Sequence, residues 1–158
     1  MEKNKDYYNE IYLSGGSGKE YLKEPKDCIY YPIWNRIIFS LDSKEKIFEL
    51  GCGVGQLAKL LINNKRNYVR GVDFSDIAIQ KAKENNREQQ DKFLVANLYD
   101  EETYDLDYDT IIACEVLEHI EFDLEIINKI KKNTMVYFSV PNFNSQSHVR
   151  FFTKIEDI

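Results

Sequence analysis

Short continuous apolar runs alternate with apolar residues at helical spacing along most of the chain. The continuous runs predict five strands, over residues 46–50, 68–73, 92–96, 110–114 and 135–140. The helical spacing predicts four helices, over residues 30–41, 56–63, 75–86 and 122–131. Strands that alternate with helices are typical of an α/β protein with a parallel sheet covered on both faces. Because crossovers between parallel strands are right-handed, we expect a doubly wound, Rossmann-like fold.

A glycine-rich turn follows the first predicted strand, where residues 49–55 read ELGCGVG. Doubly wound folds bind ligands at such strand-to-helix turns, where glycine lets the backbone approach a ligand closely. The spacing is G-x-G-x-G, whereas a dinucleotide-binding turn has G-x-G-x-x-G and would need glycine in place of Gln56. The turn therefore disfavours a nicotinamide or flavin dinucleotide. Taken alone, it is equally compatible with a tight turn that binds nothing.

Polar or aromatic side chains also end the second and third predicted strands. Asp73 stands 22 residues after Gly51, where a carboxylate can accept hydrogen bonds from both hydroxyls of a ribose. Phe74 can lie against a purine ring, and Asn97 can hydrogen-bond an adenine edge. Capping of the next helix, the alternative role for Asp73, is better met by Ser75. These residues predict one nucleoside site at the carboxyl ends of the first three strands.

Three segments in chain order resemble the motifs of class I S-adenosylmethionine-dependent methyltransferases: residues 48–55 (FELGCGVG), 71–75 (GVDFS) and 113–119 (ACEVLEH). The resemblance runs from about residue 45 to 141. It is greatest to the small-molecule branch that includes the ubiquinone-biosynthesis O-methyltransferases. It implies the strand order 3-2-1-4-5, S-adenosyl-L-methionine as cofactor, and a transferase activity.

The resemblance implies that the cofactor contacts the ends of four strands, at Glu49, Gly51, Cys52, Gly53, Gly55, Asp73, Phe74, Ser75, Asn97, Leu98 and Cys114. The glycine turn would carry the methionine part, which Glu49 helps to position. Asp73 would hold the ribose, while Asn97 and the Leu98 N–H would read the adenine edge. Cys114 would meet the methionine tail through its backbone.

The chain departs from the family at its C-terminal end. Members usually complete the sheet with an antiparallel sixth and seventh strand, but only 17 residues follow Pro141. We therefore expect these two strands to be missing or truncated. The fifth strand would then be an exposed edge that needs a cover, and a homodimer through this strand is one way to provide it.

The segment after the fourth strand carries the candidate catalytic residues, Glu115 and His119. A base that removes a proton from a hydroxyl acceptor adds about 10²–10⁴-fold to the rate, and His119 is the candidate for that role. With Glu118 these residues form E-x-x-E-H, a string that would lie on one helix face and offer ligands to Mg²⁺, Mn²⁺ or Zn²⁺. We assign no metal, because a hydrogen-bonded loop explains the same string.

Composition narrows the partners and the compartment. The chain has 21 basic and 27 acidic residues, a net charge of −6, which disfavours nucleic acid as a partner. No apolar run approaches the roughly 18 residues of a membrane span, and the first residues, MEKNKD, lack the apolar core of a signal peptide. Three cysteines without a C-x-x-C pair fit reduced thiols. We therefore expect a cytoplasmic protein without membrane contacts.

We expect a single domain over 1–158. Residues 1–42 would form an N-terminal cap, 43–141 the cofactor-binding core and 142–158 an acceptor-side segment. Four tyrosines of the cap either close over the cofactor as a lid or pack as core: Tyr7, Tyr8, Tyr12 and Tyr21. The acceptor-side segment carries an imidazole and three aromatic rings that suit a small-molecule wall or cover the sheet edge: His148, Phe143, Phe151 and Phe152.

Together these features predict an S-adenosylmethionine-dependent methyltransferase that acts on a hydroxyl or amine of a small organic molecule. The acceptor would bind between residues 114–119 and 142–152. Two alternatives stay open: an inactive, truncated methyltransferase-like binding module, and a metal-dependent RNA 2′-O-methyltransferase.

Overall fold

The computed structural model of the protein describes residues 1–154 and 156. Its centre is a five-stranded sheet in the order β3-β2-β1-β4-β5, with every neighbouring pair parallel. The strands are β1 (Ile47–Leu50), β2 (Tyr68–Asp73), β3 (Phe93–Val95), β4 (Thr110–Cys114) and β5 (Met135–Ser139). The predicted fold class and strand order are confirmed.

Among the described residues, five α-helices and five short 3₁₀ helices connect and cover these strands. The α-helices are α1 (Lys5–Ser14), α2 (Tyr31–Ser40), α3 (Gln56–Asn63), α4 (Asp76–Asn85) and α5 (Asp123–Lys129). The 3₁₀ helices are η1 (Ser17–Leu22), η2 (Pro25–Asp27), η3 (Arg87–Lys92), η4 (Glu101–Tyr104) and η5 (Leu117–His119). The predicted strands agree to within one residue at each end. The predicted helix over 122–131 is shorter, because Ile130 is already extended.

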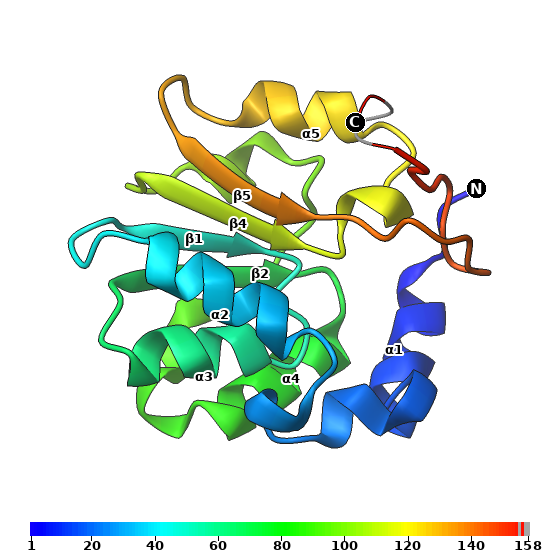
Figure 1. Ribbon diagram of the computed structural model, residues 1–158, viewed down its shortest axis with the longest axis horizontal. Coiled ribbons are helices and arrows are strands. Elements are labelled where there is room, and N and C mark those ends of the chain that lie inside the picture. Colours follow the sequence, from blue (N-terminus) through cyan, green and yellow to red (C-terminus); the bar gives the residue numbers. More distant parts are fainter. Residues whose placement is uncertain (155, 157–158) are drawn as a thin grey trace.

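Two apolar layers hold helices on opposite faces of the sheet. One layer packs α2, α3 and α4 against side chains such as Ile47 and Ile112. The other packs η4 and α5 against side chains such as Phe48 and Ile111. Figure 1 shows α2, α3 and α4 on one side of the sheet and α5 on the other. The continuous apolar run of β4 is thereby explained, since adjacent side chains enter different layers and Ile111 and Ile112 are both 0% exposed.

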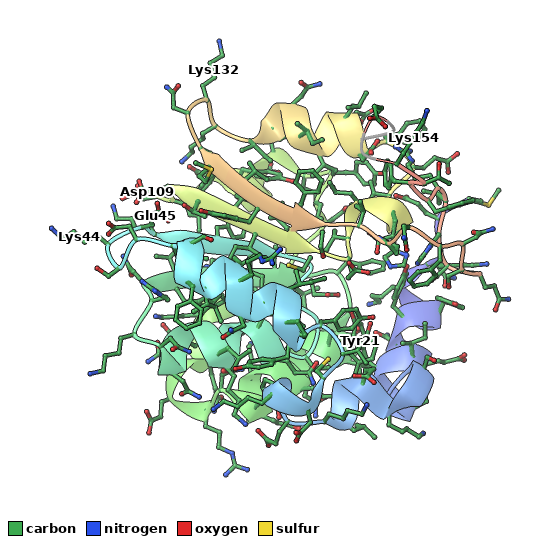
Figure 2. The ribbon with its side chains drawn as sticks, in the orientation of Figure 1. Tyr21, Lys44, Glu45, Asp109, Lys132 and Lys154 are labelled. Atoms are coloured by element: carbon green, nitrogen blue, oxygen red, sulfur yellow. The ribbon has the colours of Figure 1, made fainter. Side chains whose placement is uncertain are left out.

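The strands all end on one side of the molecule, and α1 lies beyond those ends (Figure 1). Polar contacts hold α1 against the start of α4: Asn9 Nδ2 donates to Asp76 Oδ1 at 3.0 Å, and Ser75 Oγ donates to Asn9 Oδ1. Lys44, Glu45 and Asp109 lie at the opposite end, where the strands begin (Figure 2). The carboxyl ends of the strands and α1 therefore enclose the region where the sequence predicts a site.

The final segment follows β5 as an irregular chain. Within residues 140–154 the structure contains no further strand, so β5 is an edge of the sheet in the described part of the chain. Three of its apolar side chains are exposed: Met135, Val136 and Phe138. No helix among the described residues is long and apolar enough to cross a membrane.

Candidate active site

The glycine turn between β1 and α3 depends on left-handed backbone conformations. Gly51, Gly53 and Gly55 have φ values of +65°, +50° and +75°, a region that glycine adopts without strain. A Cβ on Gly51 would lie 2.5 Å from Val116 Cγ2. The turn therefore excludes side chains at this position and brings the backbone close to the cleft.

Asp73 ties this turn to the end of β2. Its Oδ2 accepts the Gly53 N–H at 3.0 Å, and its Oδ1 accepts the Ser75 N–H at 2.9 Å. Burial raises the pKa of Asp73 to about 6, against the lowering effect of these backbone hydrogen bonds. The Tyr12 hydroxyl of α1 also donates to Oδ2, at the longer distance of 3.4 Å. A bound ligand can replace this weakest contact most easily.

Glu49 is a second buried carboxylate, in the middle of the sheet. It is 4% exposed and accepts a hydrogen bond from the Tyr68 hydroxyl at 2.7 Å. Burial raises the pKa of Glu49 to about 8, although the bond from Tyr68 opposes the shift. A cationic group beside Glu49 would favour its ionised form, so this carboxylate is suited to a ligand amino group.

Two cavities open on either side of α1, with volumes of about 440 and 530 Å³. The first lies over the ends of β2 and β3, and its walls include Asp73, Phe74, Asn97 and Leu98. The second lies over the ends of β1 and β4, and its walls include Glu49, Cys52, Gly53, Cys114, Glu118 and His148. Both are lined by Tyr8, Tyr12, Gly51, Glu115 and His119. A ligand of nucleoside size and an attached chain would therefore extend from one cavity to the other past α1.

Most of the predicted cofactor residues line one of these cavities, but Gly55 and Ser75 line neither. Gly55 is the N-cap residue of α3, and its carbonyl accepts a hydrogen bond from Asn86 Nδ2. Ser75 caps α4, because its Oγ accepts the Ala78 N–H at 3.0 Å. In this structure both residues shape the turns that carry the site.

The predicted group Glu115, Glu118 and His119 does not form on one helix face. Glu115 has a left-handed φ of +55°, which ends β4, and its Oε1 accepts the Ser139 hydroxyl at 2.7 Å. Instead, Glu118, His119 and His148 have potential ligand atoms within 4.8 Å of one another. His148 reaches this group through a tertiary contact. The segment after β5 folds back, and its Val149 N–H donates to the Glu118 carbonyl at 2.8 Å.

His119 is held as a neutral imidazole by a backbone carbonyl. Its Nδ1 lies 3.0 Å from the Ser147 carbonyl, so Nδ1 carries the hydrogen and Nε2 is left as the acceptor. Burial lowers the pKa of His119, and the bond to Ser147 opposes that effect. The ring also packs edge-on against Tyr8 and His148. This orientation suits a general base.

Glu118 is a buried carboxylate whose two oxygens have no hydrogen-bond partner among the described residues. The residue is 0% exposed, and its Oε1 lies 3.6 Å from His119 Nε2. Burial raises the pKa of Glu118 to about 8. Burial without a partner is costly for a carboxylate, so this side chain points to a ligand in the second cavity.

Parts of the acceptor region differ from the sequence prediction. Phe143 and His148 line the second cavity, whereas Phe151 and Phe152 line neither cavity. Tyr30 and Trp34 also line the second cavity, although the helical spacing predicted only a helix over residues 30–41. No local signal identifies them, because their place depends on how α2 docks.

Comparison with known proteins identifies the family to which this chain belongs. A family model described as a methyltransferase domain matches residues 48–134. The chain belongs to this methyltransferase family. The residues that line the two cavities fit S-adenosylmethionine as the cofactor. The first cavity offers a carboxylate, a ring and an amide suited to adenosine, and the second offers Glu49 to an amino group.

Three individual proteins to which the chain is similar share 25% or less of its sequence. The chain is 25% identical to the ubiquinone biosynthesis O-methyltransferase of Neisseria meningitidis serogroup C (strain 053442), over 122 residues that make up 71% of this chain. That stretch covers only half of the relative. Among solved structures, magnesium protoporphyrin IX methyltransferase of Synechocystis PCC 6803 with bound SAM has a TM-score of 0.68 at 20% identity, covering 97% of this chain and 79% of that one.

A further solved structure limits what the fold alone can establish. The [4+2]-cyclase SpnF has a TM-score of 0.59 at 17% identity, covering 72% of this chain and 46% of its own. At these identities a structural likeness shows the fold, and function has to be argued from the site.

Proposed function

We propose that the protein transfers a methyl group from S-adenosylmethionine to a hydroxyl or amine of a small organic molecule. One observation carries the proposal. His119, with Nε2 free to accept a proton, lines both cavities, as do Gly51 and Glu115. The first cavity suits the adenosine, and the second has room for the methionine tail and an acceptor beside it.

The main task of the protein in this reaction is to position the methyl group and the acceptor atom. When bound, the cofactor supplies a methyl group that its sulfonium charge already activates. Asp73 binds the ribose hydroxyls, and Glu49 binds the methionine amino group. Phe143 and His148 form the outer wall for the acceptor. Holding the two reacting atoms close together and in line supplies most of the rate enhancement that such a transfer needs.

His119 takes the proton of the acceptor at Nε2. Its Nδ1 hydrogen bond to Ser147 fixes the ring, so the acceptor proton has one nitrogen to go to. Tyr8, from α1, packs against the His119 ring and lines both cavities. The chain's other proposed traits are consistent with this activity: three free cysteines fit the cytosol, and the net charge of −6 disfavours a nucleic-acid partner.

Calorimetry and a transfer assay test the proposal together. We expect S-adenosylhomocysteine to bind and a panel of small hydroxyl and amine compounds to include a methylated product. His119→Ala should lower kcat by about 10²–10⁴-fold while the cofactor affinity changes little. An equal loss of turnover and cofactor binding would make His119 structural. Cofactor binding without any transfer would instead favour the binding module.

A second candidate is a metal-assisted transfer, favoured by the grouping of Glu118, His119 and His148. A carboxylate and two imidazole nitrogens suit a divalent transition metal, which would orient a hydroxyl acceptor and lower its pKa. Activity that requires added Mn²⁺ or Zn²⁺ and disappears with a chelator would establish it. An RNA acceptor is disfavoured, since none of the described residues lining the second cavity is a lysine or arginine.

A further inference from the structure

Acidic and no basic side chains line the second cavity among the described residues. Four carboxylates line it, from Glu20, Glu49, Glu115 and Glu118, together with the imidazoles of His119 and His148. Its described lining residues include no lysine and no arginine. Figure 2 shows Lys44 and Lys132 at the other end of the molecule, far from Tyr21, which lines this cavity. The cavity is therefore unsuited to an anionic ligand and suited to a cationic one.

In the described part of the chain, one of the four carboxylates forms an ion pair with a cationic side chain. Glu20 pairs with Lys23 and also accepts the Ile29 N–H at 2.9 Å. Glu49 and Glu115 accept bonds from uncharged hydroxyls, those of Tyr68 and Ser139. Glu118 is fully buried with both oxygens unpartnered among the described residues. Three carboxylates thus face the cavity without a neutralising side chain in the described part of the chain.

The cofactor accounts for one of these three, because Glu49 stands beside the glycine turn where the methionine amino group is expected. Glu115 and Glu118 remain, next to His119 on the acceptor side. We propose that the methyl acceptor is a primary or secondary amine that enters this cavity as an ammonium ion and is held by Glu118. This inference rests on the proposed function and narrows its acceptor from hydroxyl or amine to amine.

Aromatic rings complete a site for an organic cation. Tyr8, Tyr21, Tyr30, Trp34 and Phe143 line the same cavity. The face of an aromatic ring attracts an ammonium group by about 0.5–2 kcal/mol, and tryptophan does so best. The rings also cover the apolar part of the acceptor. The carboxylate and the ring faces both attract the positive charge of an ammonium ion, which an alcohol of the same shape lacks.

The amine, the cofactor and His119 account for every proton and electron pair in the methyl transfer. The ammonium gives one proton to His119 Nε2, from which it passes to solvent, and the neutral amine keeps its electron pair. That pair forms the new nitrogen–carbon bond while the carbon–sulfur bond of the sulfonium breaks and sulfur keeps its electrons. The products are S-adenosylhomocysteine, the methylated ammonium ion and one released proton. No oxidant, reductant or metal is needed.

The test compares matched acceptors that share a carbon skeleton. 2-Phenylethylamine, 2-phenylethanol and phenylacetate, with their aliphatic equivalents, are offered to the full chain with S-adenosylmethionine. Binding of each to the S-adenosylhomocysteine complex is measured separately by calorimetry. We expect the amines to bind and to be methylated at least tenfold more efficiently than the alcohols, and the carboxylates not to bind.

The variant Glu118→Gln keeps the shape of the side chain and removes its charge. It should raise both Kd and KM for amines tenfold or more and leave the affinity for S-adenosylhomocysteine unchanged. Glu121→Gln, three residues away on the exposed surface, is the matched control and should change neither. Calorimetry with each amine before and after substitution keeps the test valid if turnover is slow.

Several results would overturn the inference while leaving the proposed function intact. These are methylation of alcohols in preference to amines, transfer that requires a divalent metal, or equal amine binding by wild type and Glu118→Gln. Failure of every panel amine to bind the S-adenosylhomocysteine complex would also overturn it. Failure of the chain to bind S-adenosylhomocysteine at all would overturn the proposed function itself.

Discussion

Buried carboxylates at the carboxyl ends of the strands define the site at the scale of single residues. Asp73, Glu49 and Glu118 all have a raised pKa, and burial is the main cause in each case. Each is stabilised incompletely by uncharged donors or by none, so each gains from a ligand that brings donors or positive charge. The site is less stable without its ligands than an apolar core would be.

Substitution of Asp73 tests the cofactor end of the site. Asp73→Ala removes the acceptor for the ribose hydroxyls and should weaken S-adenosylhomocysteine binding by about 1–3 kcal/mol in calorimetry. Asp91→Ala, on the exposed surface, is the control and should leave the affinity unchanged. Equal affinities for wild type and Asp73→Ala would show that the ribose lies elsewhere.

Glu49 predicts a pH dependence of stability in the cofactor-free protein. Its pKa in the folded protein is raised to about 8 from an ordinary value of 4.5, so the folded state holds a proton that the unfolded state has released. The free energy of unfolding should therefore fall as pH rises from about 4.5 to 8.

Glu49→Gln keeps the bond from Tyr68 and removes the titration. Thermal melts at pH 5 and pH 8 should show a smaller loss of Tm in this variant than in wild type. The exposed Glu88→Gln should behave like wild type. An unchanged pH dependence in Glu49→Gln would mean that Glu49 stays ionised when buried.

At the scale of elements, α1 is held by one small apolar cluster around Tyr12 and by single hydrogen bonds. It lies across the cleft between the two cavities, and Asn9 joins it to Ser75 and Asp76. Single hydrogen bonds contribute only about 0.5–1.5 kcal/mol each. Local opening of α1 should therefore cost much less than unfolding of the sheet.

Asn9→Ala tests this difference in local stability. Loss of both hydrogen bonds should speed amide hydrogen exchange within Lys5–Ser14, while exchange in β1 and β4 stays as in wild type. Bound S-adenosylhomocysteine should slow exchange in α1 again, because the ligand fills the space that α1 covers. Uniform acceleration across the sheet would show instead that α1 belongs to the global folding unit.

The elements that the sequence predicts well are those set by local spacing. The strand order followed from the motifs, and the glycine turn was recognisable because a left-handed backbone needs glycine at 51, 53 and 55. The acceptor side was less predictable. Glu115 does not lie with Glu118 and His119, because its left-handed backbone ends β4. His148 lies beside them instead, because the segment after β5 folds back on Glu118. Such contacts depend on how distant segments pack together, which a short sequence motif does not predict.

At the scale of the whole molecule, β5 is an unprotected edge of the sheet in the described part of the chain. Strand β5 carries neither charge nor proline, the features that usually prevent an edge from pairing with another chain. Its exposed side chains are Met135, Val136 and Phe138, at 54%, 36% and 42%. We propose that two copies of the chain pair through β5 in an antiparallel arrangement centred on Tyr137, which would set Val136 of each copy opposite Phe138 of the other.

Phe138→Lys should break this association. A lysine on the edge would place charge against the apolar Val136 of the second copy and favour a solvated edge. Light scattering coupled to gel filtration should give twice the chain mass of 18.7 kDa for wild type and a single chain mass for the variant. Leu94→Lys, which replaces a 45%-exposed side chain on the opposite edge strand β3, is the matched control and should stay dimeric. A wild-type monomer at high protein concentration, or a dimer that Leu94→Lys disrupts and Phe138→Lys does not, would contradict pairing through β5.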